Sequence, residues 1–419
     1  MRRFARTSLV LPTLVLLALM VGAAQSAQAQ TYQVIHSFTG GADGGNPYAG
    51  LTLDRAGNLY GTTFTGGADG GGTVYKLTHK GSGWAFDPLY SFGSAGGNDG
   101  GAPAARVIFG PDGSLYGTTT SGGTKGVGTV INLRPSPKVC KTSLCPWTET
   151  VLYSFKGGTD GANPGYGDLV FDQAGNIFGT TMSGGSTNPL GPCGRAGCGT
   201  VFELSPSNGS WNEAVIYAFQ GNTGASPFSG VILDQTGNLY GTTYGGGEGS
   251  CNNGTCGTVY ELTYSGSGWA ESFLYSFTGG SNGDNPDGGL IFDPSGNLYG
   301  TTSNIATAFE LTPSGGTWIY SLLYTFGGFD DQCGPRASLV MDAAGNLYGT
   351  TTCTVPNGTV FELTPSNDGT WTYTLLHGFT GPDGEYPECN VVIDANGNLY
   401  GTTSAGGLYG YGVVWEITP

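Results

Sequence analysis

A seven-residue motif, G-N-L-Y-G-T-T or a close variant, occurs seven times and constrains the fold more than any other feature of the chain. Successive copies lie 49 to 62 residues apart, a period typical of propellers and other repeat arrays. The asparagine position of the motif is occupied by Asn58, Ser114, Asn176, Asn238, Asn297, Asn346 and Asn398. We therefore expect seven copies of one supersecondary unit.

Each copy divides into four short apolar segments. An apolar run, such as residues 51–54, is followed by an x-x-Gly-Asn turn and L-Y-G-T-T, then by G-T-V-F-E-L (199–204) and V-L-Y-S-F (151–155). Such β-branched and aromatic runs, bounded by Gly, Asn, Ser or Pro, predict strands. Four strands repeated radially form the blades of a β-propeller. The first segment is apolar at consecutive positions, so we expect it to be buried on both faces near the axis.

The two ends of the sequence are out of phase with the repeat. A fourth-type segment stands at residues 34–38, and the last segment, residues 413–417, is of the third type. The last blade would lack its outer strand, which the first residues can supply. An open β-solenoid, the alternative architecture, would have no reason to start and end out of phase with its own repeat. The sequence predicts an all-β, seven-bladed β-propeller with four-stranded blades, closed by the N-terminal strand and formed as one domain by residues 30–419.

The composition agrees with this interpretation only because of the repeat. The chain has 79 glycines and 22 prolines among 419 residues, a content that borders on that of disordered proteins. Most of the glycines, however, stand in fixed columns beside Asn, Thr or Asp. A proline also stands shortly before every first segment: Pro47, Pro103, Pro164, Pro227, Pro286, Pro335 and Pro387. These residues are expected to form the turns of a closed ring.

The amino end and the charge bear on the compartment and the partners. Residues 1–29 have a charged start, an apolar stretch and an Ala-x-Ala site, which predict a cleaved signal peptide and a secreted or periplasmic protein without a membrane anchor. The net charge of −16 disfavours nucleic acid, whose phosphates must be met by Lys and Arg. We expect a monomer.

The repeat, with its D-x-x-G-N-L-Y-G-T-T core and its G-T-V-F-E-L partner, resembles the GloVer-type tandem repeats of secreted bacterial proteins. The resemblance covers essentially the whole chain after the leader. The shorter D-x-x-G-N-L-Y half is also similar to blades of NHL and gluconolactonase-like propellers. The resemblance implies a secreted propeller and no established reaction, since a fold does not define a function.

The nine cysteines fall almost entirely in insertions between segments. In an oxidising compartment the C-x4-C pairs predict local disulfides, Cys140–Cys145, Cys193–Cys198 and Cys251–Cys256. Zinc binding by the last two pairs, which occupy equivalent loops of adjacent blades, is the alternative. A fourth bridge is expected between Cys333 and Cys353. Cys389 is then either free or exchanges with one of those two.

A column of oxygen-bearing side chains stands four residues before each proline. Five of its members are carboxylates, Asp43, Asp99, Asp160, Asp331 and Asp383. Such oxygens would suit Ca²⁺, the one cofactor that the sequence suggests. The alternative is that each Asp caps its own turn. We favour the cap, because a repeated turn needs the same residue each time, whereas a ligand site should break the symmetry.

Five aromatic residues break the symmetry on the same face. Tyr48, Tyr166 and Phe228 follow the prolines, and Phe64 and Tyr244 follow G-T-T. Aromatic rings beside Asp and Asn are typical of carbohydrate platforms. The leading hypothesis is a secreted, non-catalytic module that binds a glycan or cell-envelope polymer.

Two other functional hypotheses remain open. One is a polysaccharide lyase or hydrolase using Tyr and a carboxylate pair on that face, Asp43 with Asp99 or Asp331 with Asp383. The other is a structural envelope protein without a small ligand. The three histidines, His36, His79 and His377, form no recognisable triad or metal motif.

Overall fold

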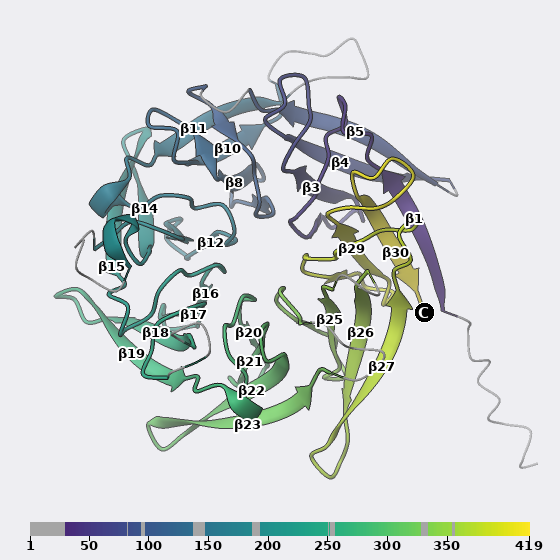
Figure 1. The fold of residues 1–419 in the computed structure, drawn as a ribbon. Coiled ribbons are helices and arrows are strands. Elements are labelled where there is room, and N and C mark those ends of the chain that lie inside the picture. The colour runs from purple at the N-terminus through teal and green to yellow at the C-terminus, as the bar shows by residue number, and fades with distance from the viewer. Residues whose placement is uncertain are drawn as a thin grey trace, which may run out of the picture.

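A computed structural model of the protein describes residues 30–81, 83–93, 97–136, 147–186, 193–249, 251, 256–327, 334–353 and 357–419. In these residues, seven four-stranded antiparallel sheets are arranged radially around a central axis (Figure 1). The prediction of a seven-bladed β-propeller is therefore confirmed. The predicted leader, residues 1–29, lies outside the described residues.

The blades are built from consecutive strands, which run in order from the axis outward. Blade 1 holds β2 (Thr52–Leu53), β3 (Leu59–Thr63), β4 (Thr73–Lys80) and β5 (Gly83–Ser91); blade 2 holds β7 (Ile108–Phe109), β8 (Leu115–Thr119), β10 (Thr129–Arg134) and β11 (Thr148–Ser154); blade 3 holds β12 (Val170–Phe171), β13 (Ile177–Thr181), β14 (Thr200–Ser207) and β15 (Ser210–Ala218); blade 4 holds β16 (Ile232–Leu233), β17 (Leu239–Thr243), β18 (Thr258–Tyr264) and β19 (Trp269–Ser276). Blade 5 holds β20 (Ile291–Phe292), β21 (Leu298–Thr302), β22 (Thr307–Ser314) and β23 (Thr317–Thr325); blade 6 holds β24 (Val340–Met341), β25 (Leu347–Thr351), β26 (Thr359–Pro365) and β27 (Trp371–Gly378); blade 7 holds β28 (Val392–Ile393), β29 (Leu399–Thr403), β30 (Val413–Thr418) and β1 (Thr31–Ser37).

The seventh blade takes its outer strand from the other end of the chain. In Figure 1 the purple β1 lies along the yellow β30, and the register joins Thr31 to Thr418 and Ser37 to Val413. The predicted closure is confirmed.

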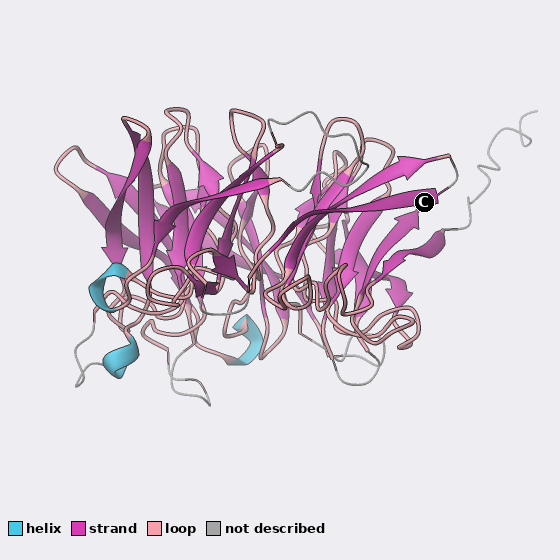
Figure 2. Ribbon diagram, turned by 90° about the horizontal axis from the view of Figure 1, so that it is seen from above, coloured by secondary structure: helices cyan, strands magenta, loops and turns pink. Residues whose placement is uncertain are grey.

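The remaining elements are short and lie outside the blades. They are the strand pair β6 (Gly100–Gly101) and β9 (Ser121–Gly122), and the 3-10 turns η1 (Gly158–Asp160), η2 (Gly194–Ala196) and η3 (Gly280–Asn282). The three 3-10 turns lie on one face of the ring (Figure 2). η1 and η3 belong to loops that precede first strands, and η2 belongs to a loop that follows G-T-T. No helix of the described residues is long and apolar enough to span a membrane.

The G-T-T motif is explained by contacts within each blade. In six blades its last threonine shares a hydrogen bond with the first threonine of the next strand, as between the Thr63 and Thr73 hydroxyls at 2.8 Å. In every blade except blade 2, where Ile131 replaces the ring, its glycine lies under an aromatic ring of the third strand, and a Cβ at Gly61 would come within 2.3 Å of the Tyr75 hydroxyl. Glycine is therefore required at this position for steric reasons.

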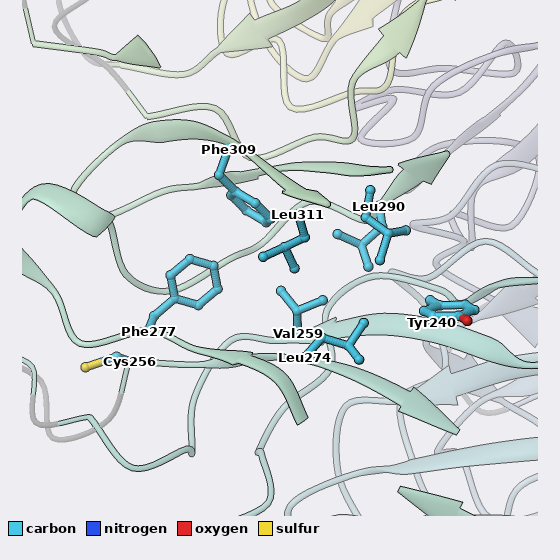
Figure 3. Close-up of a cluster of buried hydrophobic side chains, with 9 residues drawn as sticks. Tyr240, Cys256, Val259, Leu274, Phe277, Leu290, Phe309 and Leu311 are labelled. Atoms are coloured by element: carbon cyan, nitrogen blue, oxygen red, sulfur yellow. The ribbon is translucent and has the colours of Figure 1, made fainter. Parts of the chain in front are cut away.

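The hydrophobic core lies between the blades. The phenylalanine of V-L-Y-S-F packs against the third strand of the following blade, so that Phe277 meets Phe309 with ring centroids 5.3 Å apart. Around this pair, Val259 and Leu274 of blade 4 contact Leu290 and Leu311 of blade 5 (Figure 3). The G-T-V-F-E-L and V-L-Y-S-F motifs thus hold adjacent blades together.

The outer strands meet through two kinds of contact, which we call glutamate seams and aromatic seams. The tyrosine of V-L-Y-S-F donates to a glutamate of the next blade at the glutamate seams, as from Tyr217 to Glu271 at 2.6 Å. Aromatic rings stack at the aromatic seams, as for His377 on Tyr32 at 3.7 Å and His36 on Phe86 at 4.3 Å. Packing therefore accounts for these two histidines.

The innermost strands differ from the expectation. They comprise only two residues each, such as Thr52 and Leu53, and these residues are half-buried rather than buried on both faces. The preceding residue, Leu51 in blade 1, is fully buried between blades. One face of each inner strand lines an open space around the axis, which explains the difference.

Candidate functional site

The segments between the prolines and the inner strands bring the same loop position of all seven blades to the axis. We call these segments the Pro loops: residues 47–50, 103–106, 164–168, 227–230, 286–289, 335–338 and 387–390. They surround a cavity of about 570 Å³, a size typical of small-molecule sites. The cavity is therefore the candidate functional site.

The Pro loops are held in place by the repeat itself. The first threonine of G-T-T donates to a carbonyl of the following Pro loop, as from Thr62 to Ala105 at 3.1 Å and from Thr402 to Ala49 at 2.8 Å. In six of the seven blades the residue before the proline has a positive φ, 56° at Asn46, and its N–H donates to the preceding blade. The loops are thus fixed before any ligand is bound.

Two positions of the Pro loops line the cavity in all seven blades, and we number them back from the first buried residue after each loop. The position three residues earlier forms the rim ring: Tyr48, Ala104, Tyr166, Phe228, Asp287, Arg336 and Glu388. The position one residue earlier forms the waist ring: Gly50, Arg106, Asp168, Gly230, Gly289, Ser338 and Asn390. Both rings line the cavity, and neither carries the same residue type in all seven blades.

The five predicted aromatic residues all line this cavity, on one side of it. Phe64 packs edge-on against Tyr48 at 5.2 Å, and Phe228 packs against Tyr166 at 5.7 Å and Tyr244 at 5.2 Å. They form an arc over blades 1, 3 and 4, with the small Ala104 between. What they bind stays a prediction.

The opposite side of the rim ring carries three charged residues that the sequence reasoning missed. Arg336 lies between Asp287 and Glu388 in blade order, with its Nη1 3.6 Å from Glu388 Oε1. Burial raises the pKa of Asp287 to about 6, although Ser303 and Arg336 oppose the rise. Burial also raises the pKa of Glu388, against the attraction of Arg336.

The charged and aromatic sides meet at both ends of the arc. Burial and then the charge of Glu388 raise the pKa of Tyr48, and burial and then Asp287 raise that of Tyr244. Both tyrosines are therefore neutral hydrogen-bonding groups near pH 7. The cavity offers apolar ring surfaces on one side and, on the other, carboxyl and guanidinium groups that accept and donate hydrogen bonds.

The aspartates of the predicted calcium column lie on their own turns. Asp43 accepts from the backbone N–H of Thr39 at 3.0 Å, and Asp99, Asp160 and Asp383 accept from Gly93, Lys156 and Thr380 at 2.7 to 2.8 Å. None of these four lines the cavity, and Asp331 lies outside the described residues. No group of three His, Cys, Asp or Glu in the described parts of the chain could hold a metal ion.

The same arrangement bears on the carboxylate pairs suggested for a lyase or hydrolase. Asp43 and Asp99 each bind the turn of their own blade, and Asp383 does so beside His377, whose Nε2 lies 2.8 Å away. The carboxylates that do line the cavity are Asp168, Asp287 and Glu388.

Two of the predicted disulfides are present, Cys193–Cys198 and Cys251–Cys256, which excludes zinc binding by these thiols in this state. Cys140, Cys145 and Cys333 lie outside the described residues, and Cys353 is disulfide-bonded. Cys389 is free and buried in the cavity wall, where its Sγ lies 3.0 Å from the Thr402 nitrogen.

The fold and the cavity define a seven-bladed propeller with an asymmetric axial pocket. The sequence matches the Gloeobacter/Verrucomicrobia repeat over residues 24–247, 190–307 and 252–419, and the chain belongs to this family. The resemblance to the GloVer-type repeats is thereby confirmed. No curated protein matches the sequence.

Solved structures with a similar fold are distant in sequence. A putative 6-phosphogluconolactonase from Bacteroides uniformis is 15% identical, with a TM-score of 0.51 over 84% of this chain and 88% of the other. A PQQ-bound aldose sugar dehydrogenase from Streptomyces coelicolor is 12% identical, with a TM-score of 0.45 over 93% of this chain and 98% of the other. At 15% identity the likeness to the first of these structures concerns the fold alone.

Proposed function

We propose that the axial cavity binds a saccharide and that the protein is a non-catalytic module for a glycan or cell-envelope polymer. The observation that carries the proposal is the division of the rim ring. On one side the ring carries Tyr48, Tyr166 and Phe228, with Phe64 and Tyr244 packed beside them, and on the other side it carries Asp287, Arg336 and Glu388. Sugar rings have apolar C–H faces and a polar edge of hydroxyls, so each side of the cavity matches one part of a pyranose.

The charged side suits hydroxyl groups. A carboxylate accepts hydrogen bonds and a guanidinium donates them, and bonds that involve a charged partner are worth about 1.5–3 kcal/mol each. Because Arg336 is flanked by acidic residues, the cavity has no large excess of positive charge that would demand an anionic ligand. A neutral or weakly charged sugar fits this balance.

Tyr166 allows the proposal to be tested without disturbing the core, because 45% of its surface is exposed. Replacement of its ring by Tyr166→Ala removes a stacking surface worth about 1 kcal/mol, which corresponds to about a fivefold loss of affinity. Binding is measured by calorimetry against a panel of bacterial, plant and fungal glycans. Tyr264→Ala, which removes a ring that is 58% exposed at the opposite face, is the matched control. Equal loss in both variants, or no glycan bound by the wild type, would refute the proposal.

The pair of carboxyl groups in the rim ring supports a second candidate, an extracellular polysaccharide hydrolase or lyase. Asp287 titrates near pH 6, which would allow it to donate a proton, and Glu388 remains the candidate base. Release of new reducing ends or unsaturated products from a bound glycan, abolished in Asp287→Asn, would establish this function in place of the first. Binding without product formation would refute it.

A further inference from the structure

The waist ring separates the binding cavity from a second cavity further along the axis. This second cavity has a volume of about 610 Å³ and shares Arg106, Asp168, Gly230, Gly289, Ser338 and Asn390 with the first. The two cavities therefore adjoin along the axis, and the waist ring lies between them.

Side chains of the waist ring bond to one another across this boundary. Arg106 Nε donates to Asp168 Oδ2 at 2.5 Å, and Asn390 Nδ2 lies 3.5 Å from the same oxygen. Asp168 belongs to blade 3 and Asn390 to blade 7, which are not neighbours in the ring, so this contact crosses the axis. The Ser338 N–H donates to Asn390 Oδ1 at 2.8 Å, and the Gly289 N–H donates to Ser338 Oγ at 2.8 Å.

Glycines allow the waist ring to close. A Cβ at Gly230 would lie 2.1 Å from the Asp168 carbonyl oxygen, and one at Gly50 would lie 2.5 Å from the Asn390 carbonyl oxygen. The backbones of neighbouring blades therefore touch where the polar side chains cross. Together these groups form a septum.

The two sides of the septum offer different chemistry. The second cavity is lined by apolar residues of the inner strands, among them Leu53, Val170, Ile232, Phe292 and Met341. A sugar hydroxyl moved into such surroundings would lose hydrogen bonds to water without replacement. A saccharide is therefore confined to the first cavity by the septum and by the apolar lining beyond it.

We propose that the cavity binds the end of a glycan chain rather than an internal stretch. This inference rests on the proposed saccharide binding. The seven blades enclose the cavity laterally and the septum closes it axially, so a polymer enters along the axis and stops. Binding of an internal stretch would require a second opening through which the polymer could leave the cavity.

The test compares chains of one chemistry and different lengths. The ligands are size-fractionated dextrans, pullulans, xylans and β-1,3-glucans, together with linear maltohexaose and cyclic α-cyclodextrin, which has no chain end. Each ligand is titrated into the full chain by calorimetry. For a polymer that binds, we expect one protein per chain and an affinity per mole of chains that changes less than about twofold while the length rises about tenfold. One end modification, either reduction of the reducing end to the alditol or capping of the non-reducing end, should weaken binding at least about tenfold. The modification of the other end should leave binding unchanged.

The outcomes separate this inference from the function on which it rests. Several proteins per chain, an affinity that rises in proportion to length, equal binding of α-cyclodextrin and maltohexaose, or indifference to both end modifications would overturn end recognition and leave saccharide binding intact. Absence of binding to every glycan, oligomers included, would remove the proposed function and this inference with it.

Discussion

The half-buried carboxyl group of Glu271 makes the stability of a glutamate seam depend on pH. One of its oxygens accepts from the Tyr217 hydroxyl at 2.6 Å. The other, Oε1, is buried with no hydrogen-bond partner, and so is the Tyr260 hydroxyl. Burial raises the pKa of Glu271 to about 7, although the bond from Tyr217 lowers it. An ionised carboxylate is therefore poorly accommodated at this position.

The sign of the effect follows from the two pKa values of this group. Below its unfolded value of 4.5, Glu271 is neutral in both states and costs nothing. As the pH rises from 4.5 to about 7, the unfolded chain ionises first, and the free energy of unfolding falls. Complete shielding from water would make the loss at most about 3 kcal/mol, and the solvent that reaches this half-buried group reduces it to about 1 kcal/mol.

Glu271→Gln removes the charge and keeps the shape. The amide oxygen still accepts from Tyr217, and the amide nitrogen supplies a donor to the unpaired groups nearby. We expect the variant to be more stable than the wild type at pH 8 by about 1 kcal/mol, or about 1–2 °C in Tm for a domain of this size. At pH 4.5 the two proteins should melt together.

Thermal unfolding at pH 4.5, 6, 7 and 8 and constant ionic strength measures this difference. The control is Glu203→Gln, since Glu203 accepts from Ser205 and its blade carries Phe178 in place of the motif tyrosine. A difference in Tm between wild type and Glu271→Gln that is the same at pH 4.5 and pH 8, or a variant that is less stable at pH 8, would refute the reasoning.

Two further predictions concern the turns and the disulfides. Asp234→Ala leaves the N–H groups of Thr236 and Asn238, now bonded to Asp234 Oδ1 at 2.8 and 2.9 Å, without their acceptor, and should cost about 1–2 kcal/mol in chemical unfolding. Asp234→Asn should retain most of that energy, and equal losses in the two variants would contradict the turn-capping role. Replacing Cys251 and Cys256 together by Ala opens a six-residue loop and should cost about 2 kcal/mol. An unchanged Tm, with both thiols free in the native wild type, would contradict the bridge.

The fold was predictable because the seven copies of the repeat can be compared with one another within a single sequence. The motif spacing indicated seven blades, and the phase of residues 34–38 and 413–417 indicated how the last blade is completed. Both inferences need only local patterns. The half-buried inner strands were not anticipated, because two apolar residues of one short segment, such as Leu51 and Leu53, do not show that one of them faces an open axis.

The candidate site was predictable in part, for a related reason. The aromatic residues stood out against the repeat, and all five line one cavity. Asp287, Arg336 and Glu388 occupy the same rim position, so a comparison of that column for charge as well as aromaticity would have found them. The contact of Asp168 with Asn390 could not be found in this way, because it joins blades that are not adjacent and blade 3 has one extra residue in its Pro loop.

The rim ring has a consequence for protein engineering. The six Pro loops of equal length carry Tyr, Ala, Phe, Asp, Arg and Glu at the rim position, so the supporting contacts do not depend on the residue there. The residue at the rim position of each blade is therefore a type that the other blades should also accept at that position. A library that varies only these seven positions would change what the cavity recognises while the scaffold stays the same.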